Sequence, residues 1–133
     1  MLLGKISDCK NALVSWKDQL KKANCDYIPG QRGYQVSAGD VDELVAVVYA
    51  EYQHRLALAN AVDFDDLIMR TVELLQTCPQ VSEYYRHRFR YIFVDEYQDT
   101  NHAQYVLVRE LSGIDSDEQP DRKSTRLNSS HGY

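Results

Sequence analysis

Two adjacent carboxylates directly follow a short apolar segment in the second half of the chain. The apolar residues are Tyr91, Ile92, Phe93 and Val94, and the acids are Asp95 and Glu96. An unbroken run of aromatic and β-branched residues is typical of a strand that is buried on both faces of a parallel sheet. Ligands of open α/β sheets bind beyond the carboxyl ends of the strands, which is where this acidic pair falls. One such carboxylate can bind Mg²⁺ while its neighbour takes a proton from an attacking water molecule. The alternative is a solvated acidic turn after an ordinary strand.

The residues that follow make the catalytic interpretation more specific. An acidic pair after an apolar strand is the Walker B arrangement, and residues 94–100 read Val-Asp-Glu-Tyr-Gln-Asp-Thr. This segment resembles the second motif of the UvrD/PcrA/Rep family of superfamily 1 DNA helicases. The resemblance continues through residues 61–67 and 88–92 and covers about residues 6–113. It implies an α/β fold class: an incomplete P-loop NTPase (RecA-like) domain, mostly helical with one buried Walker B strand, plus part of a helical insertion subdomain.

The resemblance also implies a division of the chain. Residues 1–60 would be part of the helical 1B insertion and residues 61–113 part of the ATPase domain 1A. Residues 114–133 are polar, without helical or strand periodicity, and we expect them to be disordered. Where the family implies another buried strand, residues 121–131 carry an unrelated polar sequence. We therefore interpret the tail as foreign or adapter-derived sequence joined to a truncated gene.

As implied by the family, the parent activity is 3′ to 5′ translocation and unwinding of DNA, driven by ATP with Mg²⁺. Asp95 would bind the metal and the nucleotide, and Glu96 would contact the nucleotide and act as the catalytic base. Gln98 would belong to the catalytic group, and Asp99 and Thr100 would link the nucleotide site to single-stranded and duplex DNA. A helicase–nuclease motor subunit and a non-catalytic DNA- or partner-binding remnant are the alternatives.

A second informative stretch lies at residues 61–67. Asp63 can cap the N-terminus of a helix, with Asp66 at its third position, so these acids have a structural explanation and are not expected to bind metal. Phe64 can either pack against the core or serve as a platform for a nucleic-acid base. The residues alone favour packing, whereas the family resemblance places this aromatic along the single-strand track.

Helical spacing of apolar residues predicts most of the remaining elements. Lysines on the first helix are expected to form a solvated face, with phosphate contact as the alternative; they are Lys10, Lys17 and Lys21. The arginines before the apolar strand can likewise be solvated or contact phosphate, and the sequence does not favour either interpretation; they are Arg86, Arg88 and Arg90. The predicted helices are 5–23, 40–60, 63–78, a short one from about 81, and 101–111, with a glycine-rich loop at 24–39.

The composition is that of an ordinary globular protein, with 133 residues, 44% hydrophobic and 26% charged. The net charge of −5 argues against a dedicated nucleic-acid-binding module, which is usually basic. Three cysteines without C-x-x-C spacing favour free thiols in a reducing compartment. No long apolar segment or signal peptide is apparent, so the sequence predicts a cytoplasmic protein without membrane contact.

The sequence contains no G-x-x-x-x-G-K-[ST] motif, the loop that cradles the β- and γ-phosphates in P-loop NTPases. We therefore expect an internal piece of a helicase whose partners are the missing Walker A segment and the second RecA-like domain. On this view the chain by itself is marginally stable and hydrolyses no ATP.

Overall fold

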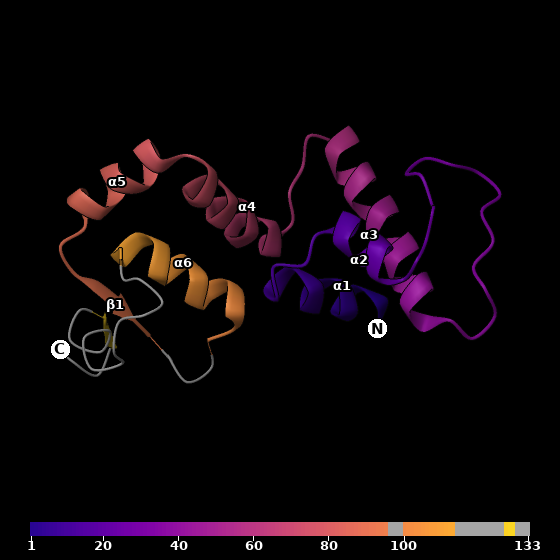
Figure 1. Ribbon diagram of the computed structural model, residues 1–133, viewed down its shortest axis with the longest axis horizontal. Helices are drawn as coiled ribbons and strands as arrows, with labels where there is room; N and C mark the ends of the chain where they lie inside the picture. The colour runs from indigo at the N-terminus through magenta and orange to yellow at the C-terminus, as the bar shows by residue number, and fades with distance from the viewer. Residues whose placement is uncertain (96–99, 114–126, 130–133) are drawn as a thin grey trace. The chain divides into compact units, whose positions relative to one another are not determined.

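The structure, a computed structural model, describes residues 1–95, 100–113 and 127–129 (Figure 1). These residues form mostly helices: α1 (Leu2–Asn11), α2 (Trp16–Lys22), α3 (Val41–Leu58), α4 (Phe64–Thr77), α5 (Pro79–Arg88), β1 (Ile92–Val94), α6 (His102–Ser112) and β2 (Leu127–Ser129). The chain divides into two compact units, Met1–Leu67 and Ile68–Tyr133. The first turn of α4 thus belongs to the first unit, which ends at Leu67.

In the first unit, α2 packs against α3 on small side chains. Ala46 and Ala50 are fully buried and let Leu20 of α2 approach α3 closely, with Tyr27 completing the cluster. Ile6 of α1 belongs to the buried residues of the same unit, and α1 also contacts α3. Burial of such apolar side chains contributes about 1.5–3 kcal/mol each.

The single helix predicted for residues 5–23 is wrong, because the structure divides it into α1 and α2. Leu13 adopts a left-handed backbone with φ of 59°, which ends the first helix. Ser15 then begins the second, since its side chain accepts a hydrogen bond from the Asp18 amide at 3.1 Å. Serine followed three residues later by an acid is a recognised start signal, so the sequence contained the information for this break.

The loop predicted between residues 24 and 39 is confirmed. Gly30, Gly33 and Gly39 all have positive φ, a conformation that glycine adopts without steric cost. Asp40 then caps α3 by accepting a hydrogen bond from the Glu43 amide at 3.0 Å.

In the second unit, Arg86 of α5 is joined to α6. Its Nε donates to the Glu110 carbonyl at 2.8 Å, and its Nη2 lies 3.4 Å from the Glu110 carboxylate. Arg86 therefore has a structural partner, whereas Arg88 and Arg90 remain exposed. Of the described helices, none combines the length and apolar character that crossing a bilayer requires.

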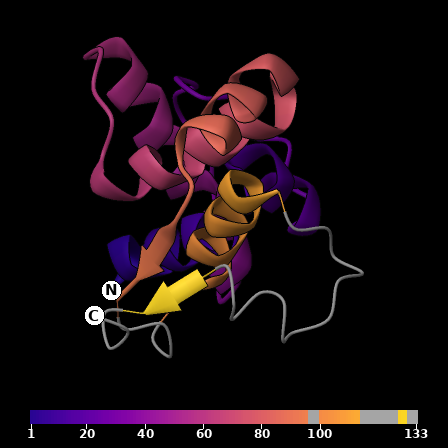
Figure 2. The same cartoon turned by 90° about the vertical axis from the view of Figure 1, so that its left-hand side faces the viewer.

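The predicted apolar strand forms at residues 92–94, but the expectation that both its faces are buried is wrong. Strand β1 pairs in parallel with β2, with Ile92 opposite Leu127 and Val94 opposite Ser129 (Figure 2). Ile92 and Val94 share one half-buried face, while Phe93 on the other face is 46% exposed and Tyr91 is 71% exposed. A two-stranded sheet covers less of a strand than the multi-stranded, doubly covered sheet that the sequence pattern predicts.

Strand β2 lies in the stretch for which we predicted no regular structure. The rest of that stretch, residues 114–126 and 130–133, lies outside the described residues.

The predicted limits of α6 are confirmed. The Asn101 side-chain oxygen accepts a hydrogen bond from the Gln104 amide at 2.9 Å, and the Asn101 amide donates one to the Gln104 side-chain oxygen at 3.3 Å. Gly113 ends the helix in a left-handed conformation with φ of 73°. The reciprocal hydrogen bonds between Asn101 and Gln104 satisfy two backbone amides that would otherwise lack partners.

We predict that Asn101→Ala lowers the free energy of unfolding by about 1 kcal/mol, because the cap to the Gln104 amide is lost. Urea denaturation of the purified chain measures this change. Asn101→Asp, which keeps an accepting oxygen, is the matched control and should stay close to the parent. Equal losses in the two variants would show that the cap does not stabilise α6.

Candidate functional site

The predicted nucleotide site follows β1. Asp95 is the first residue after the strand, lies in a turn and is exposed, as expected at the carboxyl end of a strand. Glu96, Gln98 and Asp99 lie outside the described residues. Thr100 is half-buried and lines a hollow of about 230 Å³ together with Asn101, His102 and Tyr105 of the α6 start. The acidic segment thus connects the end of β1 to the N-terminus of α6.

Asp95 is the predicted metal ligand whose position the structure gives. Within residues 1–95 and 100–113, no group of three His, Cys, Asp or Glu side chains is arranged to hold a metal. Asp95 carries a carboxylate, the type of oxygen donor that the predicted magnesium site requires. An oxygen donor of this kind suits Mg²⁺, which keeps several water ligands and needs few from protein.

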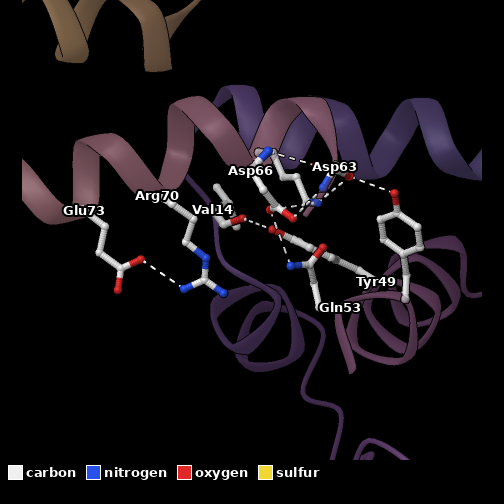
Figure 3. A network of polar contacts seen from close by, with 9 residues as sticks. Val14, Tyr49, Gln53, Asp63, Asp66, Arg70 and Glu73 are labelled. Carbon is white, nitrogen blue, oxygen red and sulfur yellow. Dashed lines mark hydrogen bonds and ion pairs between the residues drawn. The ribbon is translucent and has the colours of Figure 1, made fainter. Parts of the chain in front are cut away.

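A buried ion cluster lies at the start of α4 (Figure 3). The side chain of Lys10 has no exposed surface, and its Nζ lies 2.6 Å from Asp63 Oδ2 and 3.0 Å from Asp66 Oδ1. Tyr52 donates its hydroxyl to Asp63 Oδ2 at 2.8 Å, and the Lys10 Nζ lies 5.0 Å from the centre of the Tyr52 ring. Gln53 donates to Asp66 Oδ1 at 3.4 Å. We call Lys10, Asp63 and Asp66 the ion triad.

The expectation that Lys10 is solvated is wrong, whereas Lys17 and Lys21 are exposed as expected. Once α1 ends at Asn11, Lys10 lies one helical turn after the buried Ile6 and shares its face. Lysine is almost never fully buried without a partner. The sequence signal was therefore the i, i+4 spacing from Ile6, together with three aspartates between residues 63 and 66 that needed a cation.

The capping role predicted for Asp63 and Asp66 is confirmed. Asp63 Oδ1 accepts from the Asp66 amide at 2.9 Å, and Asp66 Oδ2 accepts from the Asp63 amide at 3.2 Å. Each carboxylate uses one oxygen for the cap and the other for Lys10. Burial by itself would raise the pKa of Asp63, but the hydrogen bonds from Lys10, the Asp66 amide and Tyr52 outweigh it and lower that pKa.

Phe64 lies between these two capping residues, yet its side chain is 77% exposed. The structure thus leaves its ring open to solvent instead of packing it in the core of this chain. The backbone on both sides of Phe64 is held in place by the ion triad and by the capping hydrogen bonds.

Two carboxylates of α3 hold the loop at residues 24–39. Glu51 accepts hydrogen bonds from the Tyr27 hydroxyl at 2.6 Å, the Gly30 amide at 2.9 Å and Arg55 Nε at 3.0 Å. These donors, the Tyr27 hydroxyl first, lower the pKa of Glu51 to about 2. Because Tyr27 is buried, it anchors the loop and does not offer a surface for stacking bases.

Glu43 holds the other half of this loop. It accepts from the Tyr34 hydroxyl at 2.9 Å and the Ser37 amide at 3.2 Å, and these hydrogen bonds lower its pKa. Glu43 also has the spacing from Asp40 that a capping box requires, but its carboxylate binds the loop instead. Gln31 and Arg32 are left exposed on the loop that the two glutamates fix.

Comparison with known proteins identifies the class. Residues 1–117 match the family described as the UvrD/REP helicase N-terminal domain. The chain is 51% identical over 118 residues to the ATP-dependent DNA helicase UvrD1 of Mycobacterium tuberculosis. It is 46% identical over 112 residues to PcrA of Staphylococcus aureus and 43% identical over 111 residues to PcrA of Bacillus subtilis.

The chain therefore belongs to the UvrD/Rep helicase family. The matched segments cover 84–89% of this chain but only 13–14% of these three relatives. The family resemblance drawn from the Val-Asp-Glu-Tyr-Gln-Asp-Thr segment is confirmed.

We predict that Lys10→Met lowers the free energy of unfolding by about 3–5 kcal/mol, because it leaves two carboxylates without their cation in a buried site. Urea denaturation at neutral pH measures the loss. Lys5→Met, an exposed lysine of the same helix with the same change of charge, should cost less than about 0.5 kcal/mol. Similar losses in both variants would contradict the importance of the ion triad.

The lowered pKa of Glu51 predicts a stability that depends on pH. Glu51 titrates near 4.3 when unfolded, but its pKa in the folded chain is about 2. Its stabilising contribution is therefore complete above the unfolded pKa and is lost as the pH falls toward the folded one. Glu51→Gln should flatten the fall of unfolding free energy across this window, while the exposed Glu83→Gln leaves it unchanged. Parallel curves for parent and Glu51→Gln would refute the assignment.

Proposed function

We propose that this chain is the segment of an ATP-driven DNA helicase that couples nucleotide hydrolysis to movement along one strand, 3′ to 5′. The observation that carries the proposal is the Asp95–Glu96 pair after β1. The pair lies in a segment that is 51% identical over 118 residues to a protein named an ATP-dependent DNA helicase. Residues 1–60 would belong to a helical 1B insertion and residues 61–113 to a RecA-like domain 1A. A helicase acts on DNA, so we place the protein in the cytoplasm.

The proposed chemistry is phosphoryl transfer to water. Asp95 holds Mg²⁺ through its exposed carboxylate, and Glu96 takes the proton from the attacking water. When bound, Mg²⁺ neutralises charge that develops on the phosphate oxygens. Gln98 orients groups within the catalytic site, and Asp99 and Thr100 connect that site to the DNA-facing segments. Support comes from the position of Thr100, which directly precedes Asn101, the N-cap of α6.

The proposed nucleic-acid contact is Phe64. Single-strand-binding proteins use aromatic rings as platforms for successive bases, and each such stack is worth about 1–3 kcal/mol. The high exposure of Phe64 leaves a ring face available to a base.

The role of Glu96 can be tested in UvrD1 of Mycobacterium tuberculosis carrying the matched residues of this chain. We predict that Glu96→Gln slows ATP turnover at least about 100-fold and leaves ATP affinity nearly unchanged, because the base acts in the transition state. The exposed Glu73→Gln is the control and should retain parental turnover. Parental turnover in Glu96→Gln would remove the base from the mechanism.

The same chimera tests Phe64. Phe64→Ala should weaken binding of an oligo-dT strand by about 1–3 kcal/mol and spare ATP affinity, since one stacked base is lost. Tyr84→Ala, which removes an exposed aromatic from α5, is the control. Equal oligo-dT affinity in the Phe64→Ala variant and its parent would exclude Phe64 from the DNA site.

A further inference from the structure

The ion triad does more than the cap of α4 requires. Asp40 caps the start of α3 by accepting one hydrogen bond, and Asn101 and Gln104 cap the start of α6 through a reciprocal pair. At α4 the two capping carboxylates, in addition, bind Lys10, which is 53 residues from Asp63 and 56 from Asp66 in the sequence. Burying an ion group is an inefficient way to stabilise a fold, since apolar side chains of similar volume usually stabilise as well or better.

The extra contacts all converge on the residues beside Phe64. Lys10 from α1, Tyr52 from α3 and Gln53 from α3 each contact Asp63 or Asp66. The backbone on both sides of Phe64 is therefore attached to two other helices, although its ring is exposed. The contacts have direction and charge, which fix an orientation more closely than apolar packing does.

We propose that Lys10 is a positioning residue for nucleic acid: through Asp63 and Asp66 it fixes the backbone that presents the Phe64 ring to a base. This proposal rests on the proposed function of Phe64. Lys10 itself is buried and does not reach phosphate, so its effect is on base stacking and not on charge attraction. A stacking platform must be held in place before the strand arrives, because ordering it on binding would cost affinity.

The decisive variant is a neutral triad, Lys10→Met with Asp63→Asn and Asp66→Asn. It removes all three charges together, so no unpaired charge is left buried, and asparagine remains a good capping residue. A purely structural role predicts that this variant behaves like the parent. A positioning role predicts a folded chain in which the start of α4 has lost its fixed orientation.

The first measurement uses the 133-residue chain. We expect an unchanged urea midpoint, together with a fall in the backbone order parameters of residues 63–66 from about 0.85 to below about 0.6. Residues 45–49 in the middle of α3 serve as the internal reference. Unchanged order at residues 63–66, or a collapsed urea midpoint, would overturn the proposal whatever happens with DNA.

The second measurement uses the helicase chimera with two probes, a dT oligomer and an abasic oligomer of the same length. The ratio of the two affinities isolates stacking from phosphate attraction. We expect the neutral triad to lower this ratio about tenfold, as Phe64→Ala does, and Lys5→Met to leave it unchanged. If Phe64→Ala lowers this ratio but the neutral triad keeps the parental value, the role of Lys10 is overturned and that of Phe64 stands. A parental ratio in Phe64→Ala overturns the proposed function of Phe64, and the proposal that rests on it.

Discussion

The contact between one buried lysine and two aspartates determines how the first unit is organised. It joins the first helix of the chain to the beginning of α4, and the aromatic and amide side chains of α3 complete its surroundings. A lysine inside a protein is costly unless its charge is met, so an arrangement that separated Lys10 from both aspartates would leave a buried charge without a partner. The ion triad thereby attaches the first turn of α4 to the rest of the first unit, which ends at Leu67.

Features governed by neighbouring residues were predictable from the sequence. The caps at Asp63 and Asn101, the helix end at Gly113 and the glycine-rich loop all depend on groups within a few residues of one another. The acidic pair and the family could also be recognised, because a motif is a local property. Asp95 lies where a residue following a strand must lie, at the strand's carboxyl end.

Features governed by distant partners were not predictable in the same way. The sequence predicts a solvated Lys10 because the aspartates that bind it are 53 and 56 residues away, and because helical spacing continues past the end of α1 at Asn11. Glu43 has the correct spacing for a capping box, yet a tyrosine hydroxyl and an amide of the preceding loop compete successfully for its carboxylate. The exposure of Phe93 depends on the number of neighbouring strands and covering layers. That number cannot be predicted from the sequence of the strand alone.

The loop at residues 24–39 has one further consequence, which concerns proteases. A protease must draw several consecutive residues into an extended form, and long loops without helix or strand are its usual targets. Here Glu51 holds Tyr27 and Gly30 while Glu43 holds Tyr34 and Ser37, so the attachment points are only a few residues apart. No stretch between them is long enough to be pulled out without first breaking a carboxylate contact. The loop is thus irregular in conformation, yet hydrogen bonds to two carboxylates oppose the local opening that cleavage requires.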